Sequence, residues 1–178
     1  MKIYGKKNIR DIMKVNRTFC IRLSLAVAIL VWCLLIFFMS AETADLSGDR
    51  SEGISRRIIN AFVEIFKLEA EDKEASIQFF EHLLRKAAHV FAYFVLSFLS
   101  LMLAFTYECK EYVRILSSSV FCLIYAQSDE IHQIFVPGRA GSMKDVLIDM
   151  SGVLISVLLV YLIKAIITLR KRKKDPEK

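Results

Sequence analysis

The residues that could carry out acid–base or ligand chemistry lie in three short stretches that interrupt apolar sequence. They are 85–89 (RKAAH), 128–133 (SDEIHQ) and 142–149, which contains two aspartates. Histidine and carboxylate side chains can transfer protons near neutral pH, and arginine can bind phosphate. The same groups can also simply pair with one another inside a protein. Their chemistry therefore depends on whether the fold brings the three stretches together.

Each stretch places its polar side chains on one face of a helix, at about 100° per residue. The first face contains His82, Arg85, His89, Tyr93, Leu96 and Ser100, with Lys86 at its margin. The second contains Cys122, Tyr125, Asp129, His132, Gln133 and Val136, and the third contains Ser142, Asp145, Asp149, Gly152 and Ser156. We expect Glu130 to point about 100° away from the second face.

No known catalytic or metal-binding motif accompanies these residues. The donor atoms of His89, Glu130, His132 and Asp145 suit a metal, but the H-E-x-x-H spacing of zinc enzymes is absent, and we predict no metal and no cofactor. A nucleophile elbow and a P-loop are absent as well. His89, Glu130 and His132 therefore remain candidates for acid–base catalysis only, and the sequence favours a non-catalytic protein.

Several of these residues have an equally good structural explanation. Asp145 follows Ser142 at the spacing of a capping box, and His89 can hydrogen-bond across two helices. Gly152 and Ser156 favour close helix packing. The Pro137-Gly138 pair predicts a turn, and Arg139 after it can bind a phosphate or pair with Asp129.

The elements that carry these residues are strongly apolar. Hydrophobic residues make up 55% of the 178 residues, yet 25% are charged, so the two classes must be separated along the chain. Four windows contain no Asp, Glu, Lys or Arg: 23–39, 87–107, 115–128 and 150–163. This separation excludes a disordered or collagen-like chain and argues against an ordinary soluble domain.

A helix needs roughly 20 residues to cross a membrane. We therefore predict an all-α integral membrane bundle of four transmembrane helices, at about 20–39, 87–107, 114–136 and 146–167. The membrane domain covers 23–163, between basic tails at 1–22 and 168–178. The last two helices reach spanning length only by including Asp129, Glu130 and Asp149, so the alternative is that they are buried helices of a soluble core.

The basic residues predict the orientation. Seven Lys or Arg precede the apolar window 23–39 and seven follow Ile163, so we place both tails in the cytoplasm and the spans in the cell membrane. We expect the tails to face anionic lipid rather than nucleic acid. The first span is too long for a cleaved signal peptide and lacks a clean cleavage site, so we predict an uncleaved anchor. No cysteine is placed outside, and we predict no structural disulfide.

The segment 40–86 is the only sizeable part placed outside the bilayer. Apolar residues at helical spacing predict amphipathic helices at 54–66 and 77–84. We expect these helices to lie on the outer membrane surface and cap the bundle, with a lid over a lipid entry as the alternative.

With this topology, all three polar stretches lie toward the outer face. The basic residues there are Arg85, Lys86, Arg139 and Lys144, and the acidic ones are Asp129, Glu130, Asp145 and Asp149. Charged groups at membrane depth usually face the bundle interior and pair, so we expect a charge-balanced cluster.

At these residues the sequence resembles the VanZ-like family of small bacterial membrane proteins. The resemblance rests on 85–89 with Tyr93, on 128–139 (SDEIHQIFVPGR), and on Asp145, Asp149 and Gly152. The 37–40 stretch (FFMS) suits the end of the family's first span, and the resemblance extends over about 23–162. Position 149 is Asp where the family often has Asn, and a glycine expected near Ser156 is absent.

The family takes its name from a protein that gives low-level resistance to teicoplanin, a lipid-bearing glycopeptide that acts at the outer membrane face. The resemblance and the predicted outer polar pocket suggest binding of a lipid, a lipid-linked precursor or a lipoglycopeptide. The ligand-binding candidates are Arg85, Lys86, His89, Tyr93, Asp129, Glu130, His132, Gln133, Arg139, Asp145 and Asp149. The alternative is a membrane-embedded enzyme acting on such a lipid, and a transporter is a weaker third option.

Overall fold

The described part of the chain is built from long helices. A computed structural model describes residues 5–41, 53, 56–58, 60, 61, 73–139 and 141–174. Its long helices are α1 (Gly5–Ser40), α3 (Lys73–Phe105), α4 (Glu111–Gln133) and α5 (Met143–Lys174). The described residues include no strand, and the all-α prediction is confirmed. Most of the predicted amphipathic helix at 54–66 lies outside the described residues.

Three of these helices are long and apolar enough to cross a membrane. They are Val15–Ser40 in α1, Ile77–Phe105 in α3 and Met143–Lys171 in α5. α4 has 23 residues, about 34 Å at 1.5 Å per residue, so its length would suffice. Its run of serines, together with Asp129 and Glu130, makes it more polar than the other three. The prediction of a multi-pass membrane protein is thus confirmed, with three clear spans and a polar fourth helix.

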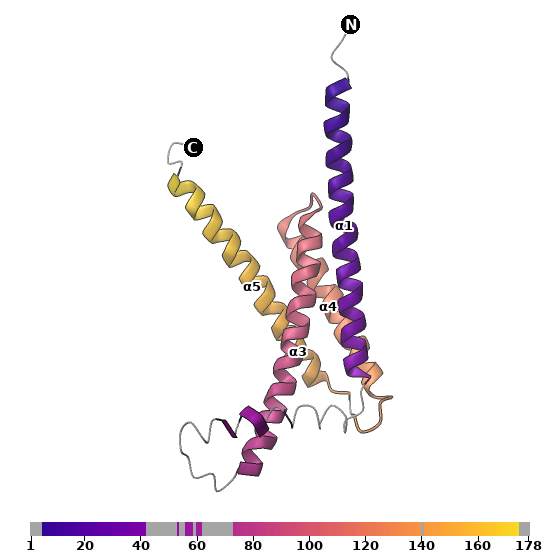
Figure 1. Cartoon of the computed structure of the whole chain (residues 1–178), viewed down its shortest axis with the longest axis vertical. Coiled ribbons are helices and arrows are strands. Elements are labelled where there is room, and N and C mark those ends of the chain that lie inside the picture. Colours follow the sequence, from indigo (N-terminus) through magenta and orange to yellow (C-terminus); the bar gives the residue numbers. More distant parts are fainter. Residues whose placement is uncertain are drawn as a thin grey trace.

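α1 and α4 run antiparallel to α3, and α5 runs parallel to it (Figure 1). Side chains fix this register at several heights: Trp32 Nε1 donates to Ala92 O at 2.8 Å, and Tyr125 Oη donates to Cys33 O at 2.5 Å. We call the end where α1 stops and α5 begins the Ser40 end. The opposite end, where α3 turns into α4, is the Thr106 end. The start of α1 and the finish of α5 both lie beyond the Thr106 end in Figure 1.

α3 is longer than the sequence suggested. The apolar run 77–84 is continuous with the predicted span, in a single helix from Lys73 to Phe105, so the expectation of a separate surface helix there is wrong. The reason is local, because 73–105 contains neither glycine nor proline and nothing ends the helix before the span begins. α1 and α5 likewise continue as helix into the predicted tails.

α3 and α5 approach each other closely at Gly152. An added Cβ there would lie 2.1 Å from Val90 O and 3.0 Å from Phe94 N. Ser156, one turn further on, is fully buried. The predicted close-packing role of Gly152 and Ser156 is therefore confirmed.

The predicted turn after α4 is also confirmed. α4 ends at Gln133, and Gly138 follows Pro137 with φ 77°, a backbone conformation that favours glycine. Arg139 N donates to Val136 O at 3.1 Å and closes the turn. This turn carries the chain across the Ser40 end to the start of α5.

Candidate functional site

At the Ser40 end, the last residue of α1 meets the last turns of α4. Ser40 Oγ donates to Asp129 Oδ2 at 2.9 Å, and Gln133 Nε2 donates to the same oxygen at 3.0 Å. All three residues are buried. Asp129 and Gln133 are one helical turn apart, so they share a face as predicted. The carboxylate of Asp129 is thus bound by a hydroxyl and an amide, not by Arg139.

Glu130 is buried as well, on the side of α4 that meets α5. Its Oε2 accepts a 2.7 Å hydrogen bond from the backbone N–H of Ser142, the residue before α5. Ser142 Oγ in turn accepts from Lys144 N at 3.2 Å. Glu130 therefore supplies the acid of a capping arrangement that the sequence assigned to Asp145. Glu130 points away from the face of Asp129, as expected, and the start of α5 covers it there.

His89 and Asp149 pair across the close contact of α3 and α5. His89 Nδ1 lies 3.3 Å from Asp149 Oδ1, and Asp149 is fully buried while the His89 side chain is 25% exposed. Tyr93, one turn after His89 along α3, is also fully buried. The absence of a side chain at Gly152 allows the two helices to come near enough for this pair.

Two further contacts hold the end of α1 against α4 and the turn. The His132 ring stacks on Phe37, with centroids 4.5 Å apart and planes inclined by 28°. Arg139 Nη2 lies 3.4 Å from Met39 O, within donating distance. His132 and Arg139 therefore contact the last turn of α1.

These contacts define a group of polar residues that we call the Ser40-end cluster. Its members are Ser40, His89, Tyr93, Asp129, Glu130, His132, Gln133 and Asp149. Asp129 interacts favourably with the charges of His89 and His132. Glu130 lies close enough to Asp129, Asp145 and Asp149 for their negative charges to repel its own. The structure therefore brings together side chains from the three polar stretches of the sequence.

Several polar atoms of the Ser40-end cluster are buried without a hydrogen-bond partner among the described residues. They are Tyr93 Oη, Glu130 Oε1, His132 Nε2 and Asp149 Oδ2, whereas Asp149 Oδ1 has only the 3.3 Å contact with His89. Buried polar atoms in folded proteins are nearly always hydrogen-bonded, to protein, water or ligand. Most of these atoms are acceptors, so they suit a ligand or water molecules that present several N–H or O–H donors.

The basic residues are arranged differently from the expected charge-balanced cluster. Arg85 Nη2 pairs with Glu81, one turn earlier on α3, at 2.8 Å. Lys86 is half-buried and Lys144 is exposed, and neither forms an ion pair with a described residue. Asp129, Glu130 and Asp149 are bound by a hydroxyl, an amide, a peptide N–H and an imidazole. The expectation of lysine and arginine paired with these three carboxylates is wrong.

Asp145, the remaining candidate, is half-buried in the first turn of α5. Its carboxylate receives no hydrogen bond from a described residue, and it contributes negative charge beside Glu130. Within the described ranges, no three His, Cys, Asp or Glu side chains are placed to hold a metal ion together.

Sequence reasoning did not assign Ser40, Phe37 or the Ser142 N–H to the site. Ser40 and Phe37 contact α4 residues that lie about 90 positions away in the chain, and helical periodicity carries no information on such pairs. The only sequence signal was the FFMS stretch at 37–40, which resembled the end of a family's first span.

Comparison with known proteins agrees with this picture. The chain matches no curated protein and no solved structure. A family model described as VanZ/LLP1 matches residues 25–164, which include α1 from its middle, α3, α4 and most of α5. The match contains every residue of the Ser40-end cluster. The chain therefore belongs to the VanZ/LLP1 family.

Proposed function

We propose that this VanZ/LLP1 protein crosses the cell membrane of a bacterium four times, with α4 as the third span and both termini in the cytoplasm. α4 packs against α3, where Ser118 Oγ donates to Ser97 O at 3.3 Å, and against α1, where Asp129 meets Ser40. The basic residues in the first half of α1 and at the end of α5 support a cytoplasmic Thr106 end. The Ser40 end then faces outward.

We further propose that the Ser40-end cluster binds the polar head of an envelope amphiphile: a lipid, a lipid-linked precursor or a lipoglycopeptide. The single observation that carries this proposal is the set of buried acceptor atoms without described partners, chiefly Asp149 Oδ2 and Glu130 Oε1. A head group rich in hydroxyl or amide donors would satisfy them, while its apolar tail remained in the lipid. By this binding the protein would lower susceptibility to teicoplanin-type antibiotics.

Lipid analysis of the purified protein tests this proposal. Asp129→Asn removes one charge but keeps an oxygen that can accept from Ser40, so the variant should fold. We expect a specific lipid to co-purify with the wild-type chain and to be lost or strongly reduced in Asp129→Asn. Glu81→Gln is the control, because it removes a charge at the same end outside the cluster. Identical lipid profiles for wild type and Asp129→Asn would overturn binding at this cluster.

One observation favours a second function, acid–base catalysis on a lipid-linked substrate. His89 is held by Asp149 through Nδ1 and is partly exposed, an arrangement in which a carboxylate can orient an imidazole toward a substrate. His89→Gln and Glu130→Gln separate the two functions when they are compared at equal membrane levels. If the protein is a catalyst, both variants should lose essentially all catalytic activity. If it is a binding protein, each variant should lose only part of the antibiotic protection. Full protection in both variants would contradict a role for the cluster of either kind.

A further inference from the structure

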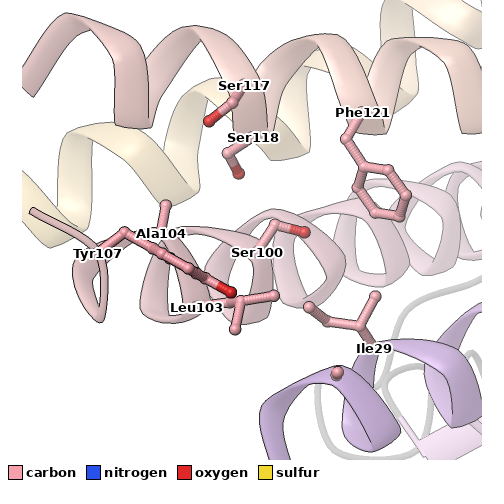
Figure 2. Close-up of a pocket in the computed structure, with 9 residues that line it drawn as sticks. Ile29, Ser100, Leu103, Ala104, Tyr107, Ser117, Ser118 and Phe121 are labelled. Carbon is pink, nitrogen blue, oxygen red and sulfur yellow. The ribbon is translucent and has the colours of Figure 1, made fainter. Parts of the chain in front are cut away.

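A crevice lies at the Thr106 end, away from the Ser40-end cluster. It has a volume of about 360 Å³ and is bounded by α1, α3 and α4. Figure 2 shows Ile29 of α1 facing Leu103 and Ser100 of α3, with Phe121 of α4 above them. Ala26 and Ala104 leave space on two of the walls because their side chains are small. The volume falls within the usual range of ligand pockets, roughly 300–1,000 Å³.

The walls of the crevice are mostly apolar, and Tyr107 lies at the end nearest the α3–α4 link (Figure 2). Of the hydroxyls that line it, that of Ser118 bonds Ser97 O and that of Ser117 bonds Arg114 O. Neighbouring α1 side chains that point away from the bundle are apolar and exposed, such as Val27 at 51% and Leu30 at 59%. The surroundings of the crevice are therefore suited to lipid chains.

Arg22, which forms no ion pair with a described residue, lies beside this end of the crevice. The Arg22 guanidinium lies 4.0 Å from the centroid of the Tyr107 ring. Its Nε and Nη2 donate to Thr106, at 3.1 Å to Oγ1 and 2.6 Å to the backbone oxygen. Both acceptors are neutral, and within the described ranges no carboxylate pairs with Arg22. Nη1 remains available to donate.

A second guanidinium, that of Arg114, contacts the backbone of Tyr107. Arg114 Nη2 donates to Tyr107 O at 3.1 Å, while its Nη1 lies 3.4 Å from Glu111. The charge of Arg114 is thus partly compensated and that of Arg22 is not. An apolar crevice beside an uncompensated arginine matches an amphiphile that has an anionic head and an apolar chain.

We propose that the crevice binds one anionic phospholipid from the membrane leaflet at the Thr106 end. Its phosphate would lie on Arg22, and one acyl chain would run between α1, α3 and α4 past Ala26 and Ala104. This site is separate from the outward cluster, and the proposal does not depend on what that cluster binds.

Native mass spectrometry of the full-length protein in detergent tests the proposal, with phosphatidylglycerol and phosphatidylcholine of identical acyl chains as probes. We expect phosphatidylglycerol to bind about fivefold more tightly, the order expected from one basic residue near an anionic head group. Arg22→Gln should abolish this preference, whereas Arg17→Gln, an exposed arginine on the same helix, should keep it. Equal binding of the two lipids by the wild-type chain would overturn the proposal.

A second pair of variants tests the crevice while leaving Arg22 in place. Ala26→Phe fills the crevice and should weaken the binding of both lipids severalfold, whereas Val27→Phe, on the neighbouring exposed position, should not. If inorganic phosphate alone displaced the lipid at millimolar concentration and Ala26→Phe had no effect, the site would be a simple anion site. That result would overturn the proposal even if Arg22→Gln failed to fold.

Discussion

At the scale of single residues, the Ser40-end cluster is organised by neutral donors around buried carboxylates. Asp129 accepts from Ser40 and Gln133, and Glu130 accepts from a backbone N–H. Hydrogen bonds to a charged acceptor contribute more than neutral ones, about 1.5–3 kcal/mol. No described lysine or arginine pairs with these carboxyl groups, so the cluster offers acceptor atoms that a donor-rich ligand would match.

Replacement of Glu130 by alanine should loosen the start of α5. The variant loses the charged hydrogen bond to Ser142 N, at a cost of about 1.5–3 kcal/mol. Hydrogen exchange should become faster at the amides of 142–145. Asp145→Ala is the matched control, since Asp145 forms no such bond and only its favourable charge near the helix start is lost, about 0.3–1 kcal/mol. Equal exchange rates in the two variants would contradict the capping role of Glu130.

At the scale of helices, the pairing of α3 with α5 depends on one glycine. The backbone of α3 occupies the position that a Cβ at Gly152 would need. Two parallel helices in this close contact bring His89 to Asp149 at the Ser40 end and place Phe105 against Tyr161, with ring centroids 6.2 Å apart, toward the Thr106 end. The register of the two helices therefore determines the geometry of the cluster.

Gly152→Ala should separate α3 from α5. The added methyl group meets backbone atoms of Val90 and Phe94, which cannot move as a side chain can, so we expect a loss of about 1–3 kcal/mol from overpacking. Thermal unfolding in detergent measures this loss. Gly53→Ala is the control, because nothing lies within 4 Å of an added Cβ there. An unchanged melting temperature for Gly152→Ala would be inconsistent with the close contact.

At the Thr106 end of this helix pair, hydrogen bonds to the carboxylate of Glu111 link α5 to α4. Lys164 and Tyr161 of α5 both donate to the side chain of Glu111, the first residue of α4. The hydrogen bond from Lys164, and then that from Tyr161, hold the pKa of Glu111 below its usual value of 4.5. Since the pKa is lower in the folded state, the stabilisation is present above pH 4.5 and disappears as the pH falls through the lowered pKa.

This link predicts a difference between two unfolding profiles. When the pH is lowered from neutral to below 4.5, the unfolding midpoint of the wild-type chain should decrease more than that of Glu111→Gln. The variant has no carboxylate to titrate at this position. Glu108→Gln removes a nearby carboxylate outside the link and should keep the wild-type profile. Superimposable profiles for wild type and Glu111→Gln would rule out a contribution from this link.

At the scale of the whole molecule, the apolar surface and the positions of the basic ends of α1 and α5 suit a membrane. α1 exposes apolar side chains along much of its length, for example Leu30 at 59% and Leu34 at 46%. Such a surface would be unfavourable in water and is natural in lipid. α1 and α5 separate from each other toward the Thr106 end (Figure 1), where the basic residues gather.

Thiol labelling tests the proposed orientation. Cys109 lies in the link between α3 and α4 at the Thr106 end and is partly exposed. In a Cys20→Ser background, an impermeant thiol reagent should label Cys109 in inverted membrane vesicles but not in intact cells. A cysteine introduced at Asp45, in the segment predicted to lie outside, should show the opposite pattern. Strong labelling of Cys109 from outside would reverse the topology.

Much of the fold could be predicted from the sequence because its signals are local. Apolar windows and helical periodicity predicted the long helices, and Pro137-Gly138 predicted the turn between α4 and α5. Small residues four positions apart predicted the close packing at Gly152. The sequence did not predict the full length of α3. The chain becomes free of charged residues at residue 87, and this change is a stronger signal than the absence of a helix-breaking residue before it.

The partners of the polar residues were decided only by the tertiary structure. Periodicity gives the direction of a side chain around its own helix, but not the height or rotation of the helix that faces it. For this reason the sequence could place Glu130 on α4 but could not show that the start of α5 would cover it and take its hydrogen bond. The sequence by itself determined that polar groups enter an apolar helical bundle, and packing of α1, α4 and α5 decided which of them meet.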